Sequence, residues 1–72
     1  MAMSVKSGWI TDKNGVKKHY KNYWIHNDDG PAVIFPNGEK RWYQSGNLHR
    51  IDGPAIESPD GTVLWFINGE LK

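Results

Sequence analysis

The segment NLHRIDGPAIESPDG, residues 47–61, repeats with small changes the segment WIHNDDGPAVIFPNG at residues 24–38. Both contain the pattern H-x-x-DGPA-x-x-x-P, followed by Asn-Gly or Asp-Gly, and a displacement of 23 residues superimposes them. A pattern that occurs twice in so short a chain indicates either a site used twice or a structural corner made twice.

The same displacement aligns most of the remaining chain. Trp42 falls on Trp65, and a degraded earlier copy places Gly15 on Gly38. Terminal copies of a repeat array are often atypical, because one of their sides has no neighbour. We therefore predict one domain, residues 1–72, of about three copies: 7–29 (degenerate), 30–52 and 53–72.

Each copy has the composition of β-hairpins. Runs such as PAVIF and EKRWYQ suit strands, and the Asn-Gly or Asp-Gly between them is a strong hairpin signal, because both residues tolerate positive φ. No long stretch has helical periodicity. We expect an all-β fold in which antiparallel hairpins of period 23 form one twisted meander sheet.

Two aromatic ladders are adjacent in these copies. The first consists of His19, Trp42 and Trp65. The second consists of Tyr20, Tyr43 and Phe66. Neighbouring residues of a strand point to opposite faces of the sheet. We expect the tryptophan ladder to lie in the core and the tyrosine ladder to be a contact surface.

The charges are unevenly distributed along the chain. Residues 1–25 carry five lysines and one aspartate, which gives +4, whereas residues 26–72 carry four basic and seven acidic side chains, which gives −3. This asymmetry suits a polyanion bound at one end, or head-to-tail pairing between copies of the chain. Two solvated surfaces without a partner are the third interpretation.

The chain contains no cysteine, no apolar run long enough to span a membrane, and no signal-peptide stretch in its opening MAMSVKSG. We expect a cytoplasmic protein without membrane contact, in the host cytoplasm if a phage encodes it.

The repeated His-x-x-Asp raises the question of chemistry. His26 with Asp29, and His49 with Asp52, could form the His–carboxylate pairs that serve as general bases or metal ligands. A catalytic set also needs a nucleophile and positioning groups, for which no candidate is evident. We favour a corner in which Asp accepts backbone N–H bonds before Gly-Pro and His braces the turn. A metal or proton role and catalysis are the alternatives.

We therefore predict no catalytic residue, no metal site and no cofactor. The residues interpreted as structural parts of the repeat are Gly30, Pro31, Trp42, His49, Asp52, Gly53, Pro54 and Trp65.

Lysines and tyrosines are interleaved in the first copy. Lys17, Lys18 and Lys21 flank Tyr20 and precede Tyr23. Lysines beside aromatic rings suit a nucleic-acid backbone with stacked bases. Solvated lysines that protect an edge strand from aggregation would have the same pattern.

The pattern DGPA…P(N/D)G…W…(S/N)G-x-L-H-R-x-DGPA resembles the MORN-type repeats, in particular the MORN-like variant of small phage and bacterial proteins. The resemblance covers residues 24–72 and, less fully, 9–23. It implies stacked antiparallel hairpins and a role in protein interaction or scaffolding. Lipid binding is not implied, because GPA replaces the aromatic-rich opening of the usual repeat. The first copy, SGWITDKNGVKKHYKNYW, also resembles the Trp/Tyr-rich repeats of choline- and glucan-binding wall modules.

Together these observations favour a non-enzymatic module that binds another protein and also pairs with itself, as a dimer. If a phage encodes the chain, the resemblance suggests that it binds and blocks a host defence protein. The alternative is a binder of a small ligand or a polyanion, nucleic acid or glycan, through the first copy; nucleic acid is not favoured. The predicted partner-binding residues are Lys17, Lys18, Tyr20, Tyr23, Tyr43 and Phe66.

Overall fold

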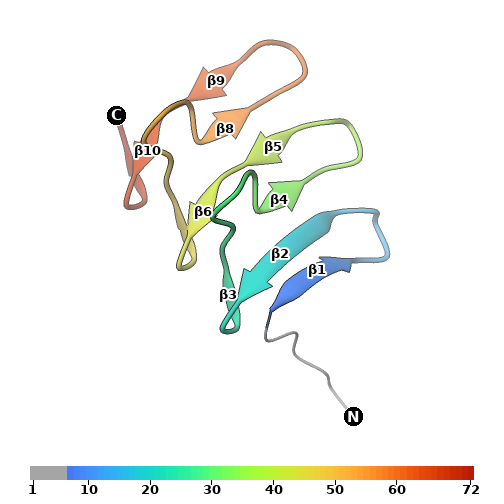
Figure 1. Cartoon of the computed structure of the whole chain (residues 1–72). Coiled ribbons are helices and arrows are strands. Elements are labelled where there is room, and N and C mark those ends of the chain that lie inside the picture. The colour runs from blue at the N-terminus through green and yellow to red at the C-terminus, as the bar shows by residue number, and fades with distance from the viewer. Residues whose placement is uncertain (1–6) are drawn as a thin grey trace.

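The computed structural model describes residues 7–72 as a succession of antiparallel hairpins (Figure 1). Six strands follow one another in one meander sheet, in the order β1-β2-β4-β5-β8-β9, and β3 pairs with β2. The predicted fold class is confirmed. None of the described residues belongs to a helix, so this part of the chain contains no helix able to cross a membrane. The strands are β1 (Gly8–Thr11), β2 (Lys17–Lys21), β3 (Trp24–Ile25), β4 (Val33–Ile34), β5 (Lys40–Arg41), β6 (Tyr43–Gln44), β7 (Asn47–Leu48), β8 (Ile56–Glu57), β9 (Val63–Leu64), β10 (Phe66–Ile67) and β11 (Glu70–Leu71).

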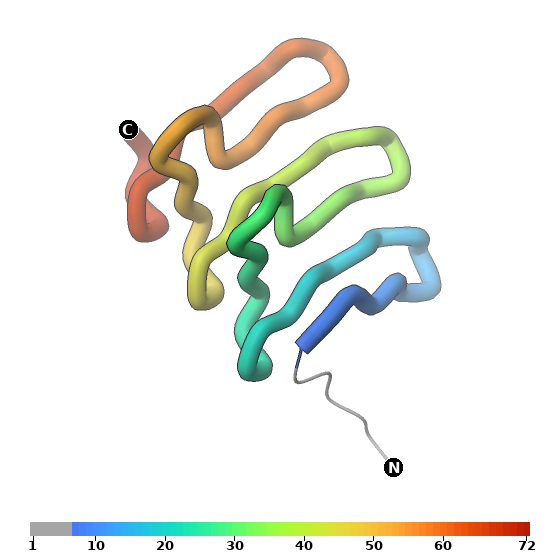
Figure 2. The backbone as a smooth tube through the Cα atoms, viewed as in Figure 1, coloured from blue at the N-terminus to red at the C-terminus, as the bar shows by residue number. Residues whose placement is uncertain are grey.

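Each copy has the same plan: a long hairpin in the main sheet, then a short hairpin beside it (Figure 2). The long hairpins are β1-β2, β4-β5 and β8-β9. The short ones join the end of β2 to β3, β6 to β7, and β10 to β11. The second and third short hairpins are separate two-stranded sheets, whereas we expected all strands to share one sheet.

The chain leaves the main sheet at the tryptophan ladder. The N–H of Trp42 donates to the carbonyl of Ala55 at 2.8 Å, and its carbonyl accepts the N–H of His49 at 3.0 Å. His19 makes the corresponding bond to the carbonyl of Ala32 at 2.7 Å. Because the N–H of Trp42 bonds the next copy while its carbonyl bonds His49 of its own copy, the run EKRWYQ is divided into β5 and β6 rather than forming the single strand we expected.

The buried core of the described residues is small and aliphatic: Ala32, Val33 and Ala55. Both alanines lie where two copies meet, a contact that we call a seam: their carbonyls accept the N–H groups of His19 and Trp42 of the preceding copy. The expectation that the tryptophan ladder forms the core is wrong, since Trp42 is half-buried and Trp65 is 46% exposed. The molecule measures 39 × 24 × 18 Å, so it is too thin to enclose large rings.

The turns of the long hairpins are closed by glycine. In the second copy, the N–H of Gly38 donates to the carbonyl of Phe35 at 2.9 Å, and the N–H of Phe35 donates to the carbonyl of Glu39. Gly38 has φ +97°, whereas Asn37 is not left-handed. Of the two Asn-Gly residues only the glycine therefore adopts positive φ, as in a three-residue loop with a glycine bulge.

The turns of the short hairpins need positive φ at two successive residues, as type I′ turns do. Ser45-Gly46 and Asn68-Gly69 meet this need with glycine in second place, at φ +84° and +83°. In the first copy that place is held by Tyr23, at φ +70°. A side chain in the left-handed region costs about 1–2 kcal/mol. The first short hairpin is therefore strained in a way that the other two are not.

We predict that Tyr23→Gly raises the urea midpoint of unfolding, by an amount that corresponds to about 1 kcal/mol. The Tyr23 side chain is mostly exposed, so its removal sacrifices little packing. Gly69→Ala is the matched reverse change, because an added Cβ there meets only Asn47 at 3.6 Å, an ordinary contact. It should lower the midpoint by a similar amount. A lower midpoint for Tyr23→Gly would contradict the assignment of strain.

Candidate binding groove

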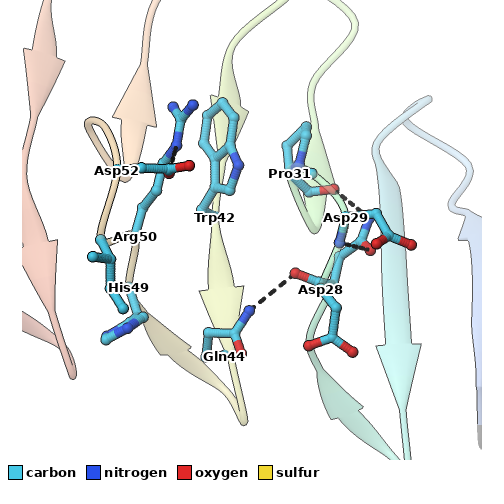
Figure 3. A pocket seen from close by; sticks show the side chains of 11 residues that line it. Asp28, Asp29, Pro31, Trp42, Gln44, His49, Arg50 and Asp52 are labelled. Carbon is cyan, nitrogen blue, oxygen red and sulfur yellow. Dashed lines mark hydrogen bonds and ion pairs between the residues drawn. The ribbon is translucent and has the colours of Figure 1, made fainter.

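A groove of about 690 Å³ lies between the two seams of the array (Figure 3). One wall is the loop of residues 26–31, which we call the first seam loop, and the other is residues 49–54, the second seam loop. The floor is formed by Trp42 and Gln44, on the segment that runs between the two loops. The lining residues are Asn27, Asp28, Asp29, Gly30, Pro31, Trp42, Gln44, His49, Arg50, Ile51 and Asp52.

The two walls are held by different side chains at equivalent repeat positions. In the first seam loop, the Asn27 amide donates to the carbonyl of Pro31 at 3.0 Å and accepts the N–H of Asp29 at 3.1 Å. In the second, the Arg50 guanidinium donates to the carbonyl of Pro54 at 3.1 Å. The residue after each histidine therefore braces the corner.

Arg50 also shapes the floor of the groove. Its guanidinium lies 3.9 Å from the centre of the Trp42 ring, a cation–π contact, and donates to Glu57 at 2.9 Å and Asp52 at 3.2 Å. Figure 3 shows the indole standing between Arg50 and Asp52 on one side and Pro31 on the other. A Cβ on Gly53 would lie 2.7 Å from the guanidinium carbon, so a larger residue there would displace the Arg50 side chain.

The two repeated histidines hold the next copy in place. The N–H of Ser45 donates to Nδ1 of His26, and the N–H of Asn68 donates to Nδ1 of His49, each at 2.9 Å. Because Nδ1 accepts, the neutral ring carries its hydrogen on Nε2. Both imidazoles thus connect the end of one short hairpin to the turn of the following one.

Neither histidine pairs with the aspartate three residues later, a pairing that was the alternative to the structural corner. His26 donates through Nε2 to Asp28 at 2.7 Å, and Asp52 pairs with Arg50. The expected corner, in which Asp29 and Asp52 accept backbone N–H bonds, is wrong for the same reason: the braces are Asn27 and Arg50. The spacing of residues in the sequence does not show which of several nearby polar side chains is long enough to reach the backbone of the corner.

Carboxylates outnumber cations on the walls. Asp28, Asp29 and Asp52 face the groove, and Arg50 is the one guanidinium there. The hydrogen bond from His26, followed by that from Lys21 at 3.0 Å, lowers the pKa of Asp28 below its usual value. Asp29 accepts no hydrogen bond through its side chain from residues 7–72. The groove is therefore negative at neutral pH, with one carboxylate available to a partner.

An apolar side chain projects beside these charges. Ile51 is 80% exposed, the most exposed large apolar residue in the described part of the chain. A groove with an aromatic floor, an aliphatic rim and one carboxylate that has no partner among residues 7–72 can accept a side chain that has an apolar stem and a cationic end. No three His, Asp or Glu side chains within residues 7–72 lie together as a metal ion would require.

The six residues predicted to bind a partner lie outside this groove. Lys17 and Lys18 are neighbours in β2 and so point to opposite faces of the sheet, and Tyr20 is half-buried beside them. Tyr43 and Phe66 begin β6 and β10 and are half-buried, whereas Tyr23 is exposed in its turn. The six therefore do not form one continuous surface.

Five of the residues interpreted as structural do line the groove, namely Gly30, Pro31, Trp42, His49 and Asp52. Of the remaining three, Gly53 and Pro54 belong to the second seam loop without lining the groove, and Trp65 lies in the third copy, which has no following copy within the described residues. Four lining residues were not predicted from the sequence: Asn27, Asp28, Gln44 and Ile51. The one signal for a site at this loop was an apolar residue, Ile51, among polar neighbours.

Comparison of the chain with protein-family models, with curated proteins and with solved structures finds no match. The resemblance to MORN-like repeats therefore stays a prediction. The assignment of the groove depends on its own geometry.

We predict that His49→Ala lowers the free energy of unfolding by about 1 kcal/mol, because the N–H of Asn68 loses its acceptor. His49→Asn is the matched control, since its side-chain oxygen can take the place of Nδ1. Amide hydrogen exchange should be faster at Asn68 in His49→Ala and closer to the unmodified chain in His49→Asn. Equal exchange in all three proteins would rule out this role for the imidazole.

Proposed function

We propose that this protein is a non-catalytic module that binds another protein by holding a basic, extended segment of it in the groove between the seam loops. The observation that carries the proposal is the combination of the Trp42 ring, the exposed Ile51 and the Asp29 carboxylate, which has no partner among residues 7–72, in the lining of one groove. A lysine or arginine would place its stem on the ring and its charge at the aspartates.

A binding role suits the groove better than a catalytic one. The imidazoles of His26 and His49 both use Nδ1 to accept a backbone N–H, so neither ring has two free nitrogens for proton transfer. The walls are also tied to the sheet: Gln44 donates to the carbonyl of Asn27 at 3.0 Å, and Arg50 bridges Trp42 and Glu57. Such a preorganised groove loses little conformational entropy when a segment binds.

The polyanion alternative has less support from the geometry. Lys17 and Lys18 point to opposite faces, and the ammonium of Lys21 bonds Asp28 at 3.0 Å. A polyanion would therefore meet isolated lysines rather than a stripe.

Binding of short peptides, followed by NMR, tests the proposal. A peptide with a central Arg between apolar residues should shift the signals of the Trp42 indole N–H and the Ile51 methyl groups, and the same peptide with Glu should not. Ile51→Ser should weaken binding, and so should Asp29→Asn, by about two- to five-fold, as expected for an exposed ion pair.

Asp60→Asn is the control for the charge change, because Asp60 lies in the β8-β9 turn, away from the groove lining. It should leave the affinity for the Arg peptide unchanged. Equal loss in Asp29→Asn and Asp60→Asn would mean that only net charge matters. Shifts centred on Lys17 and Lys18 with an oligonucleotide, and none at Trp42 with the Arg peptide, would replace the proposal with the alternative.

A further inference from the structure

The main sheet has two outer strands within the described residues, β1 and β9, each paired on one side only. Inside the array, the second strand of each long hairpin pairs with the first strand of the next long hairpin. Thus β2 pairs with β4, with Lys18 opposite Val33, and β5 pairs with β8, with Arg41 opposite Ile56. Leu64 is the repeat equivalent of Lys18 and Arg41, and Ile10 is the equivalent of Val33 and Ile56.

We infer that copies of this chain join head to tail: β9 of one copy pairs antiparallel with β1 of a second, with Leu64 opposite Ile10 and Val63 opposite Thr11. This pairing continues the 23-residue period from one molecule to the next. It concerns the ends of the sheet, so it goes beyond the proposed function and does not depend on the groove.

The exposure of equivalent residues supports this pairing. Val33 has a strand of the preceding copy on one side and is 4% exposed, whereas Ile10, at the same position in the first copy, is 43% exposed. At the other end, Val63, Leu64 and Trp65 are all exposed. Exposed apolar edge strands are templates for pairing with another chain.

The backbone supplies a second, independent observation. In the two inner seams, His19 donates its N–H to the carbonyl of Ala32, and Trp42 donates to that of Ala55. Trp65 holds the same position, yet its N–H has no backbone acceptor within residues 7–72. In the inferred pairing the acceptor is the carbonyl of Trp9 of the second copy. The two indoles then lie opposite each other, and cross-strand aromatic pairs of this kind are stabilising.

Charge favours the same arrangement. Residues 1–25 carry +4 and residues 26–72 carry −3, so opposite ends attract and like ends repel. Pro36 lies against Gly15, and Pro59 lies against Gly38, in the turn of the preceding copy. Lys13 takes the proline position in the first copy, so in the pairing it lies over Gly61, next to the carboxylate of Asp60.

The geometry decides which kind of assembly forms. A head-to-tail contact uses two different surfaces, and each added copy exposes the next one, so growth continues unless rotation closes a ring. The dimer expected from the sequence is then only the first step. Because association costs translational and rotational freedom that adjacent repeats of one chain do not lose, the assembly should form at high protein concentration.

Sedimentation velocity of the unmodified chain and of two edge variants tests the inference. The N–H of Asp12 bonds Val16 inside the β1-β2 hairpin, so that of Thr11 points outward. The carbonyl of Thr62 accepts the N–H of Ser58 inside β8-β9, so the N–H of Val63 also points outward. Thr11→Pro and Val63→Pro therefore each block one end and leave the hairpin bonds intact.

The unmodified chain should exceed the monomer mass of 8.2 kDa increasingly as its concentration rises. Between about 10 µM and about 1 mM, each variant alone should stay monomeric. An equimolar mixture of the two should reach twice the monomer mass and no more, since one variant keeps its β9 edge and the other its β1 edge. A monomeric unmodified chain over this range would overturn the inference. So would association of either variant alone, as in a two-fold contact.

Cysteine cross-linking tests the register without a proline. The chain contains no cysteine, so a mixture of Leu64→Cys and Ile10→Cys should give a covalent heterodimer on mild oxidation. The control mixture, Val63→Cys with Ile10→Cys, is one residue out of register and places the thiols on opposite faces. Its yield should be at least several-fold lower by the geometry of a disulfide. Equal yields from both mixtures would overturn the assigned register.

Discussion

The backbone hydrogen bond from Trp42 to Ala55, with its equivalent from His19 to Ala32, is the interaction on which the rest of the structure depends. It turns the chain out of one hairpin sheet while bonding it to the next copy. Both alanines at these bonds are completely buried. Repetition of this bond from copy to copy places the hairpins side by side and forms the groove between the two seam loops. Within residues 7–72 it leaves one unpaired strand edge at each end of the main sheet.

A chain held in this way needs little core. Within residues 7–72 the buried apolar residues are only Ala32, Val33 and Ala55, and further contacts run between neighbouring copies: histidine to turn N–H, proline to turn glycine, and Trp24 to Gly46. Repeat proteins gain stability from such nearest-neighbour contacts rather than from one central core. Within residues 7–72 the first and third copies each have a neighbour on one side only, and the exposed apolar residues of β1 and β9 are the direct result.

Much of this architecture could be predicted from the period. The copy boundaries and the turn glycines require only local chemistry, and Gly46 and Gly69 mark the two-residue turns directly. The exposure of the tryptophans could not be predicted, because hydrophobicity does not reveal that a sheet without a second layer leaves both of its faces open to solvent. The corner was misassigned for another reason. Asn27 and Arg50 hold equivalent loops of two copies but are different residue types, so the repeated sequence pattern did not indicate their shared role.

Part of the candidate site followed from the sequence and part did not. The repeated motif pointed to the loops that form the walls, but it was interpreted as structure alone. The histidines accept N–H bonds from the following turns. The groove exists because Trp42 lies between two such loops, and only the three-dimensional stacking of copies brings residues from both seams together.

Native-state amide exchange at low protein concentration tests most directly whether the seams hold the structure together. If they do, the N–H groups of His19 and Trp42 exchange slowest of all and at rates close to that of global unfolding. Slowest exchange within the short hairpins, at the Tyr43 and Leu48 pair, with fast exchange at His19 and Trp42, would contradict the account.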